Sequence, residues 1–126
     1  TYGHQCGDRI LVELVNSVKS GTREKVDWLA RYGGDEFLLV MPEANEKQAF
    51  QTSQRIRKLV EEMQIAWEGR VIPITVSIGL ACFSPAEAAM SVDAEMLVKA
   101  ADEALYKAKQ TGRNKVAANF IKKLIA

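Results

Sequence analysis

The sequence predicts a single α/β or α+β domain, in which helices pack against a layer of strands. Three observations support this fold class. The chain has 126 residues, which is the usual size of one domain. Its composition, 48% hydrophobic and 26% charged, is typical of a folded globular protein. Helical and extended patterns alternate between glycines and prolines, with no repeat, linker or low-complexity tract among them.

The first third of the chain predicts a helix followed by a hairpin. Apolar residues recur at helical spacing over residues 8–18, and Ser20-Gly21 ends this helix. Residues 26–32 and residues 36–41 are two strand-like runs. Gly33-Gly34 separates these runs, which predicts a hairpin with positive φ in its turn.

The remainder of the chain predicts two helices and further strands. Residues 46–63 predict a helix capped by Asn45. Residues 71–81, after a turn at Glu68-Gly69, predict one strand covered on both faces, with an edge or bulge near Pro73. Residues 93–110 predict a helix closed by Gly112, and residues 115–118 a last strand. The residues expected on the buried side of the 46–63 helix are Ala49, Ser53, Ile56, Val60 and Met63.

The charge balance and the apolar pattern exclude several classes of partner. A net charge of +1 leaves no broad basic face for duplex nucleic acid or an anionic membrane. The longest apolar run, residues 71–83, is shorter than the about 20 residues of a membrane helix. No secretion signal is apparent, and Cys6 and Cys82 lack metal-ligand spacing. We therefore predict a cytoplasmic domain that contacts neither nucleic acid nor membrane, and leave open a membrane anchor elsewhere in the protein.

The segment 31–37, Arg-Tyr-Gly-Gly-Asp-Glu-Phe, carries the clearest chemistry. Gly33 and Gly34 let the backbone turn tightly and approach a bulky anion. The carboxylates of Asp35 and Glu36 would repel each other and a phosphate, unless a divalent cation lay between them. Oxygen ligands of this kind suit Mg²⁺. The alternative interpretation is a hairpin with an exposed acidic tip.

Four motifs, taken together, resemble the GGDEF family, the diguanylate cyclase domain. The Arg-Tyr-Gly-Gly-Asp-Glu-Phe signature is complete at residues 31–37. Residues 3–8 match the family's Gly-His-x-x-Gly-Asp element, and residues 75–79 match its Thr-x-Ser-x-Gly strand. Residues 101–109 and 112–114 match its last helix and loop. The resemblance implies a palm-like, nucleotidyl-cyclase fold: a central, mostly antiparallel sheet flanked by helices.

The resemblance also implies a reaction. Two GTP molecules, one on each of two facing domains in a homodimer, would condense to cyclic di-GMP and pyrophosphate. Asp35 is implied as a metal ligand and catalytic residue. Glu36 is implied as a further ligand, or as the group that helps deprotonate the attacking hydroxyl. The implied cofactor is Mg²⁺ or Mn²⁺, and Gly33 and Gly34 would let the phosphates lie close over the turn.

Three more residues have implied contacts with the substrate, each with a structural alternative. Asp8 would accept hydrogen bonds from guanine, and alternatively could cap the first helix. Lys109 and Arg113 would bring positive charge to the terminal phosphates. The alternative for both is a solvated basic end of a helix, favourable beside the helix dipole.

The chain departs from the family pattern at its start. The family places an Asp-x-x-x-Phe-Lys-x-x-Asn-Asp segment before the Gly-His element. That segment supplies a central strand, a second metal-binding aspartate and a guanine-contacting asparagine. Because the chain begins at Thr1, we expect a fragment that lacks the family's N-terminal helix and first strand. Such a fragment would be inactive alone and would self-associate, rearrange or be poorly stable.

A second departure concerns the family's inhibitory product site, Arg-x-x-Asp. The matching positions here are Glu24 and Asp27, and Arg23 lies one position out of register. Because Glu24 reverses the charge, we expect no feedback inhibition by this route. Two alternatives to a cyclase remain: a non-catalytic module that binds GTP and regulates a neighbour, and a mononucleotide cyclase or polymerase-like palm domain. The intact carboxylates argue against the first and the hairpin signature against the second.

Overall fold

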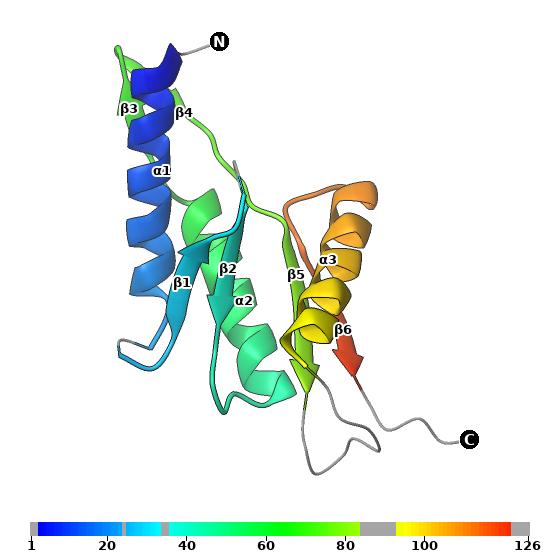
Figure 1. Cartoon of the computed structure of the whole chain (residues 1–126). Helices are drawn as coiled ribbons and strands as arrows, with labels where there is room; N and C mark the ends of the chain where they lie inside the picture. Colours follow the sequence, from blue (N-terminus) through cyan, green and yellow to red (C-terminus); the bar gives the residue numbers. More distant parts are fainter. Residues whose placement is uncertain (1–2, 24, 34–35, 84–92, 122–126) are drawn as a thin grey trace, which may run out of the picture.

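The computed structural model describes residues 3–23, 25–33, 36–83 and 93–121. Within them the chain forms three helices and six strands (Figure 1). No helix in this part is both long enough and apolar enough to cross a membrane. The helices are α1 (Gly3–Ser20), α2 (Glu46–Glu61) and α3 (Ala94–Gln110). The strands are β1 (Trp28–Arg31), β2 (Phe37–Val40), β3 (Ile65–Trp67), β4 (Arg70–Ile72), β5 (Ile78–Phe83) and β6 (Val116–Ile121).

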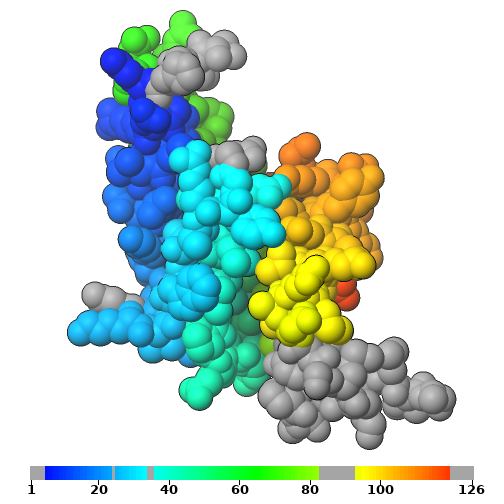
Figure 2. Space-filling view, in the orientation of Figure 1, coloured from blue at the N-terminus to red at the C-terminus, as the bar shows by residue number. Residues whose placement is uncertain are grey.

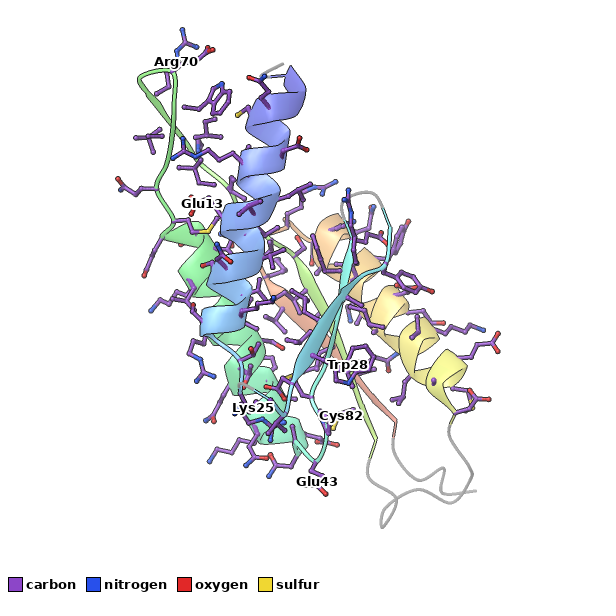
Figure 3. All side chains as sticks on the ribbon, turned by 60° about the vertical axis from the view of Figure 1, so that its left-hand side comes forward. Glu13, Lys25, Trp28, Glu43, Arg70 and Cys82 are labelled. Carbon is purple, nitrogen blue, oxygen red and sulfur yellow. The ribbon has the colours of Figure 1, made fainter. Side chains whose placement is uncertain are left out.

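The described strands pair two by two. β1 and β2 are antiparallel, as are β3 and β4, whereas β5 and β6 are parallel. In Figure 1, β2 lies between β1 and β5, and β6 follows β5. Both α2 and α3 contact the β5–β6 pair, and Figures 1 and 3 show them on opposite sides of it. The α+β prediction is confirmed, with two antiparallel pairings and one parallel pairing in this part of the chain.

Helix α2 matches its prediction closely. The Asn45 side chain accepts a hydrogen bond from Gln48 N at 2.8 Å, and the Gln48 side chain accepts one from Asn45 N at 3.0 Å. This reciprocal capping box satisfies two backbone donors at the start of the helix. Met63, expected on the buried side, lies beyond the helix and is half-buried. The buried side consists of Ala49, Ser53, Ile56 and Val60.

Helix α1 corrects one interpretation of Asp8. The helix begins at Gly3, so Asp8 lies in its second turn with its side chain exposed. It therefore does not cap this helix. The helix ends at Ser20, as expected, and Gly21 is buried directly after it. A Cβ on Gly21 would lie 3.1 Å from side-chain carbons of Ile56 and Leu59, which shows how closely the end of α1 approaches α2.

The prediction of one strand over residues 71–81 is wrong. The run divides into β4, which ends at Ile72, and β5, which begins at Ile78. Pro73 follows β4 directly, and its missing N–H removes a donor from any ladder that would continue. β4 pairs with β3 through the predicted Glu68-Gly69 turn, where both residues have positive φ. The expected cover on both faces also fails at Val71, which is 59% exposed.

Candidate functional site

The turn between β1 and β2 presents Glu36 on a closed backbone. Tyr32 N and Gly33 N both donate to the Glu36 carbonyl oxygen, at 2.9 and 3.2 Å. Arg31 Nε donates to the Gly33 carbonyl at 3.3 Å. A Cβ on Gly33 would lie 3.8 Å from Glu36 Oε2, so the carboxylate lies beside the glycine that the signature places there. The backbone of Glu36 is thus fixed where the hairpin turns.

The predicted hairpin is confirmed, with one correction. Gly33 does not adopt positive φ. A Cβ at this position would make only ordinary van der Waals contacts with Glu36, at 3.7 Å from its Cβ and 3.8 Å from Oε2. Gly34 and Asp35, the other two predicted site residues of the turn, lie outside the described residues.

The chemistry of this turn fits a divalent cation. Among residues 3–23, 25–33, 36–83 and 93–121, no group of three histidines, cysteines or acids could hold a metal ion. Glu36 nevertheless supplies a carboxylate at the turn, and Asp35 precedes it in the sequence. Hard oxygen ligands of this type are those that Mg²⁺ takes, together with water and substrate phosphate. A nucleotide would therefore have to complete the coordination.

A hollow of about 390 Å³ adjoins the hairpin along α1. Its lining includes Leu11 and Val12 of α1, together with Arg31 and Phe37 beside the turn. Asp8 precedes Leu11 by three residues and Val12 by four, a spacing that places all three on one side of the helix. A mostly apolar hollow of this kind suits a flat base, and Asp8, which is not part of its lining, lies one helical turn before Leu11 and Val12. The sequence does not single out this lining, because its apolar residues follow the same periodicity as core residues.

Lys109 and Arg113 lie at the carboxyl end of α3. Gly112 ends the helix with φ of 118°, as predicted, and Arg113 N donates to the Ala108 carbonyl at 2.9 Å. Within the described residues neither Lys109 nor Arg113 forms an ion pair. Figures 1 and 2 show the α3–β6 loop at the same end of the molecule as the β1–β2 turn. The structure therefore brings these cations to the end where Glu36 lies, from a separate element.

The carboxylate of Asp27, at the position of the family's product site, already accepts hydrogen bonds from Arg23. Arg23 Nη2 and Nε donate to Asp27 Oδ1 at 2.7 and 3.1 Å, and Arg23 N donates to Oδ2 at 2.8 Å. Burial would raise the pKa of Asp27, whose side chain is 1% exposed, but the hydrogen bonds from Arg23 leave that pKa lowered. Arg23 Nη2 also donates to the Pro42 carbonyl at 2.8 Å. Glu24 lies outside the described residues.

The chain matches the family model of the GGDEF diguanylate cyclase domain over residues 1–115. Diguanylate cyclase A of Treponema denticola is 43% identical over 117 residues, which cover 92% of this chain and 30% of that protein. Diguanylate cyclase DosC of Escherichia coli is 42% identical over 117 residues, which cover 92% of this chain and 24% of that protein. The chain thus spans less than a third of the length of these curated relatives.

Solved structures show the same likeness in three dimensions. Diguanylate cyclase SiaD of Pseudomonas aeruginosa, solved with its activator SiaC, gives a TM-score of 0.81 at 32% identity over 93% of this chain and 43% of that chain. The GGDEF domain of DgcB from Caulobacter crescentus, solved in complex with c-di-GMP, gives 0.81 at 30% identity over 94% of this chain and 67% of that chain. The sequence comparisons and the structural comparisons thus point to the same family, and the β1–β2 turn carries the signature of that family. The chain belongs to the GGDEF family of diguanylate cyclase domains.

Proposed function

We propose that this chain is the catalytic domain of a diguanylate cyclase, which condenses two GTP molecules into cyclic di-GMP and releases pyrophosphate. The observation that carries the proposal is the β1–β2 turn, whose backbone hydrogen bonds hold Glu36 beside Gly33. A chain that only needed a surface turn would not require two adjacent carboxylates next to two glycines. The chain belongs to a family of diguanylate cyclase domains, and a turn with these residues suits the reaction of such enzymes.

In this proposal each residue has a distinct task. Asp8 accepts hydrogen bonds from guanine at the end of the α1 hollow. Gly33 and Gly34 leave room for the phosphates over the turn, and Lys109 and Arg113 contact the terminal phosphates. Asp35 and Glu36 would hold Mg²⁺ or Mn²⁺, which neutralises charge on the phosphate oxygens when bound.

The chemical step requires two domains. Glu36 helps to deprotonate the 3′-hydroxyl of its own GTP, which attacks the α-phosphate of the GTP on the facing domain, and pyrophosphate leaves. We therefore propose a homodimer as the active form. Because GTP is the substrate, we also propose that the domain works in the cytoplasm.

A second candidate is a GTP-binding module that regulates a neighbouring domain without turnover. Both candidates would bind GTP in the same hollow and at the same turn, but only catalysis requires the carboxylates of Asp35 and Glu36. Incubation of the intact protein with GTP and Mg²⁺ tests the choice. We expect cyclic di-GMP and pyrophosphate to accumulate in a 1:2 ratio. GTP that binds and is recovered unchanged would support the regulatory module.

Product inhibition gives a separate prediction. We expect the initial rate of GTP condensation to remain unchanged when cyclic di-GMP is added. The physical reason is that Arg23 already occupies both carboxylate oxygens of Asp27, while Glu24 replaces the arginine that would hold the product. Calorimetry provides the check. Tight binding of cyclic di-GMP that disappears in an Asp27→Ala variant would contradict the prediction.

A further inference from the structure

The loop between α3 and β6 holds its backbone in an unusual conformation. Three consecutive residues have positive φ: Gly112 at 118°, Arg113 at 60° and Asn114 at 46°. Glycine adopts this region freely and asparagine tolerates it, but an arginine there is uncommon. Residues held in such conformations persist only where surrounding contacts determine them. The loop that carries Arg113 therefore needs support from outside itself.

Asn114 provides that support through α2. Its side-chain oxygen accepts a hydrogen bond from Arg57 Nη1 at 3.2 Å, and its side-chain nitrogen donates to Glu61 Oε2. Arg57 Nη1 also forms an ion pair with Glu61 Oε2 at 3.1 Å, and Arg57 Nε donates to Gln54 at 2.9 Å. The three side chains of Arg57, Glu61 and Asn114 thus close a triangle, in which each residue has a polar contact with both of the others.

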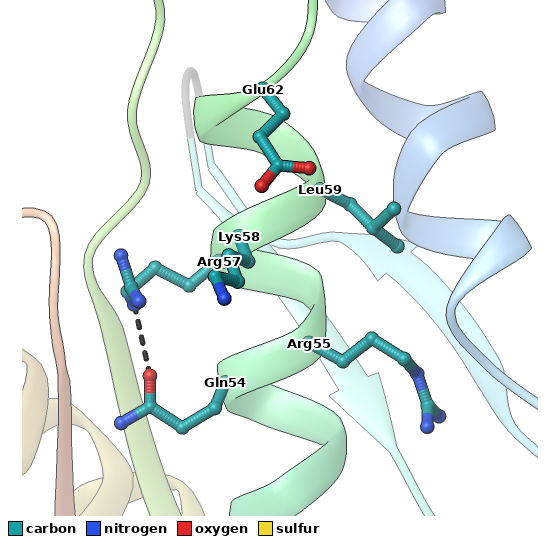
Figure 4. Close-up of a pocket in the computed structure, with 6 residues that line it drawn as sticks. All are labelled: Gln54, Arg55, Arg57, Lys58, Leu59 and Glu62. Carbon is teal, nitrogen blue, oxygen red and sulfur yellow. Dashed lines mark hydrogen bonds between the residues drawn. The ribbon is translucent and has the colours of Figure 1, made fainter.

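A second contact fixes the backbone of the same residue. Asn114 N donates to Ser77 Oγ at 3.2 Å, and Ser77 lies directly before β5. Figure 4 shows Arg57 extending from α2 toward β5, while Arg55 extends to the opposite side of the helix. Asn114 therefore forms hydrogen bonds with α2 and with the residue before β5, both of which are distant from it in the sequence. Its neighbour Arg113 is exposed and has no ion-pair partner among the described residues.

We propose that Asn114, held by Arg57 and Glu61, is a positioning residue that aims Arg113 at the terminal phosphates of GTP. This inference rests on the proposed function, because it takes Arg113 as a phosphate contact. Arg57 does not serve as the phosphate ligand, because Glu61 already neutralises its charge. The triangle instead restricts Arg113 before GTP binds. Arg113 therefore loses less conformational entropy on binding.

Only asparagine combines the two properties that this position uses. It tolerates left-handed φ, and its amide donates to one partner while accepting from another. Glycine would keep the backbone conformation and remove both side-chain hydrogen bonds. An Asn114→Gly substitution therefore separates the hydrogen-bonding role from the backbone requirement.

The test is calorimetric binding to the intact protein, with Mg²⁺ present, of GMP and of a GTP analogue that cannot be cleaved between its α- and β-phosphates; this analogue stands for GTP in every binding measurement below. We expect Asn114→Gly to weaken GTP binding roughly three- to tenfold and to leave GMP binding unchanged, because GMP lacks the terminal phosphates. In an Arg113→Ala background, Asn114→Gly should cause no further loss. Glu61→Gln, which keeps the shape of the side chain, should give a smaller loss of the same kind.

Asn119→Gly is the matched control. Asn119 donates to the Ala100 carbonyl at 3.3 Å and so ties β6 to α3 away from the loop. The Asn119→Gly variant should have a lower melting temperature than the wild type and should bind GTP and GMP with unchanged affinity. GTP binding by Asn114→Gly equal to that of the wild type would overturn the inference. So would a parallel loss of GTP and GMP binding, since a merely structural role would produce that result. Failure of the wild type to bind GTP would instead overturn the proposed function, on which the inference depends.

Discussion

Replacing Glu36 by glutamine is expected to lower the rate of cyclic di-GMP synthesis at saturating GTP by at least about 100-fold, the usual contribution of a general base. The turn should survive the change, because its hydrogen bonds are accepted by the backbone carbonyl of Glu36 and not by its side chain. An amide cannot take the proton of a hydroxyl group and is a poorer ligand for a cation. Initial rates of pyrophosphate release measure the effect.

Glu13→Gln is the matched control for this substitution. Glu13 is exposed on α1 (Figure 3), so that variant should retain the wild-type rate. Circular dichroism should give the same melting temperature for both variants and the wild type. A Glu36→Gln enzyme with more than about a tenth of the wild-type rate would show that Glu36 is not the base.

Gly79→Ala is expected to give the largest loss of stability. A Cβ at residue 79 would lie 2.1 Å from the Ala101 carbonyl oxygen and 2.3 Å from Leu105 N, so β5 and α3 would have to separate. Overpacking against backbone atoms cannot be relieved by a change of rotamer. We expect the free energy of unfolding to fall by about 3 kcal/mol or more, measured by urea denaturation.

Gly7→Ala makes a sharp comparison with Gly79→Ala. Gly7 lies within α1, and nothing lies within 4 Å of the position that its Cβ would take. Alanine favours a helix over glycine by about 1 kcal/mol, so this variant should be as stable as the wild type or more stable. Equal urea midpoints for Gly79→Ala and the wild type would mean that β5 and α3 do not pack as described.

The sequence allowed α2 and the hairpin to be predicted well, because their signals are local. Asn45 and Gln48 form a capping box within four residues of each other, and two glycines separate two strand-like runs. Helix α1 begins at Gly3, five residues before its predicted start at residue 8. Cys6 is fully buried and precedes Ile10 by one helical turn, so it extends the apolar stripe of α1, but a single cysteine among polar residues does not show this in the sequence.

The remaining differences come from interactions that a linear pattern does not contain. The end of β4 at Ile72 depends on the pairing of β4 with β3. The short β3 shows no clear alternation of polar and apolar residues, so the sequence does not reveal this pairing. The triangle of Arg57, Glu61 and Asn114 joins residues more than 50 positions apart. The residues of segment 31–37 by themselves predict a cation and phosphate site at the turn, whereas the contacts of Asp8, Lys109 and Arg113 with the substrate are implied only by the resemblance. The roles of all the site residues stay predictions: Asp8, Gly33, Gly34, Asp35, Glu36, Lys109 and Arg113.

The proposed activity depends on binding of a magnesium–nucleotide complex at the β1–β2 turn. A crystal structure of the intact protein with Mg²⁺ and a non-hydrolysable GTP analogue tests it most directly. We expect a cation about 2.1 Å from carboxylate oxygens of Asp35 and Glu36, with the phosphates over Gly33 and the base near Asp8. Nucleotide bound elsewhere, with the turn facing only water, would contradict it.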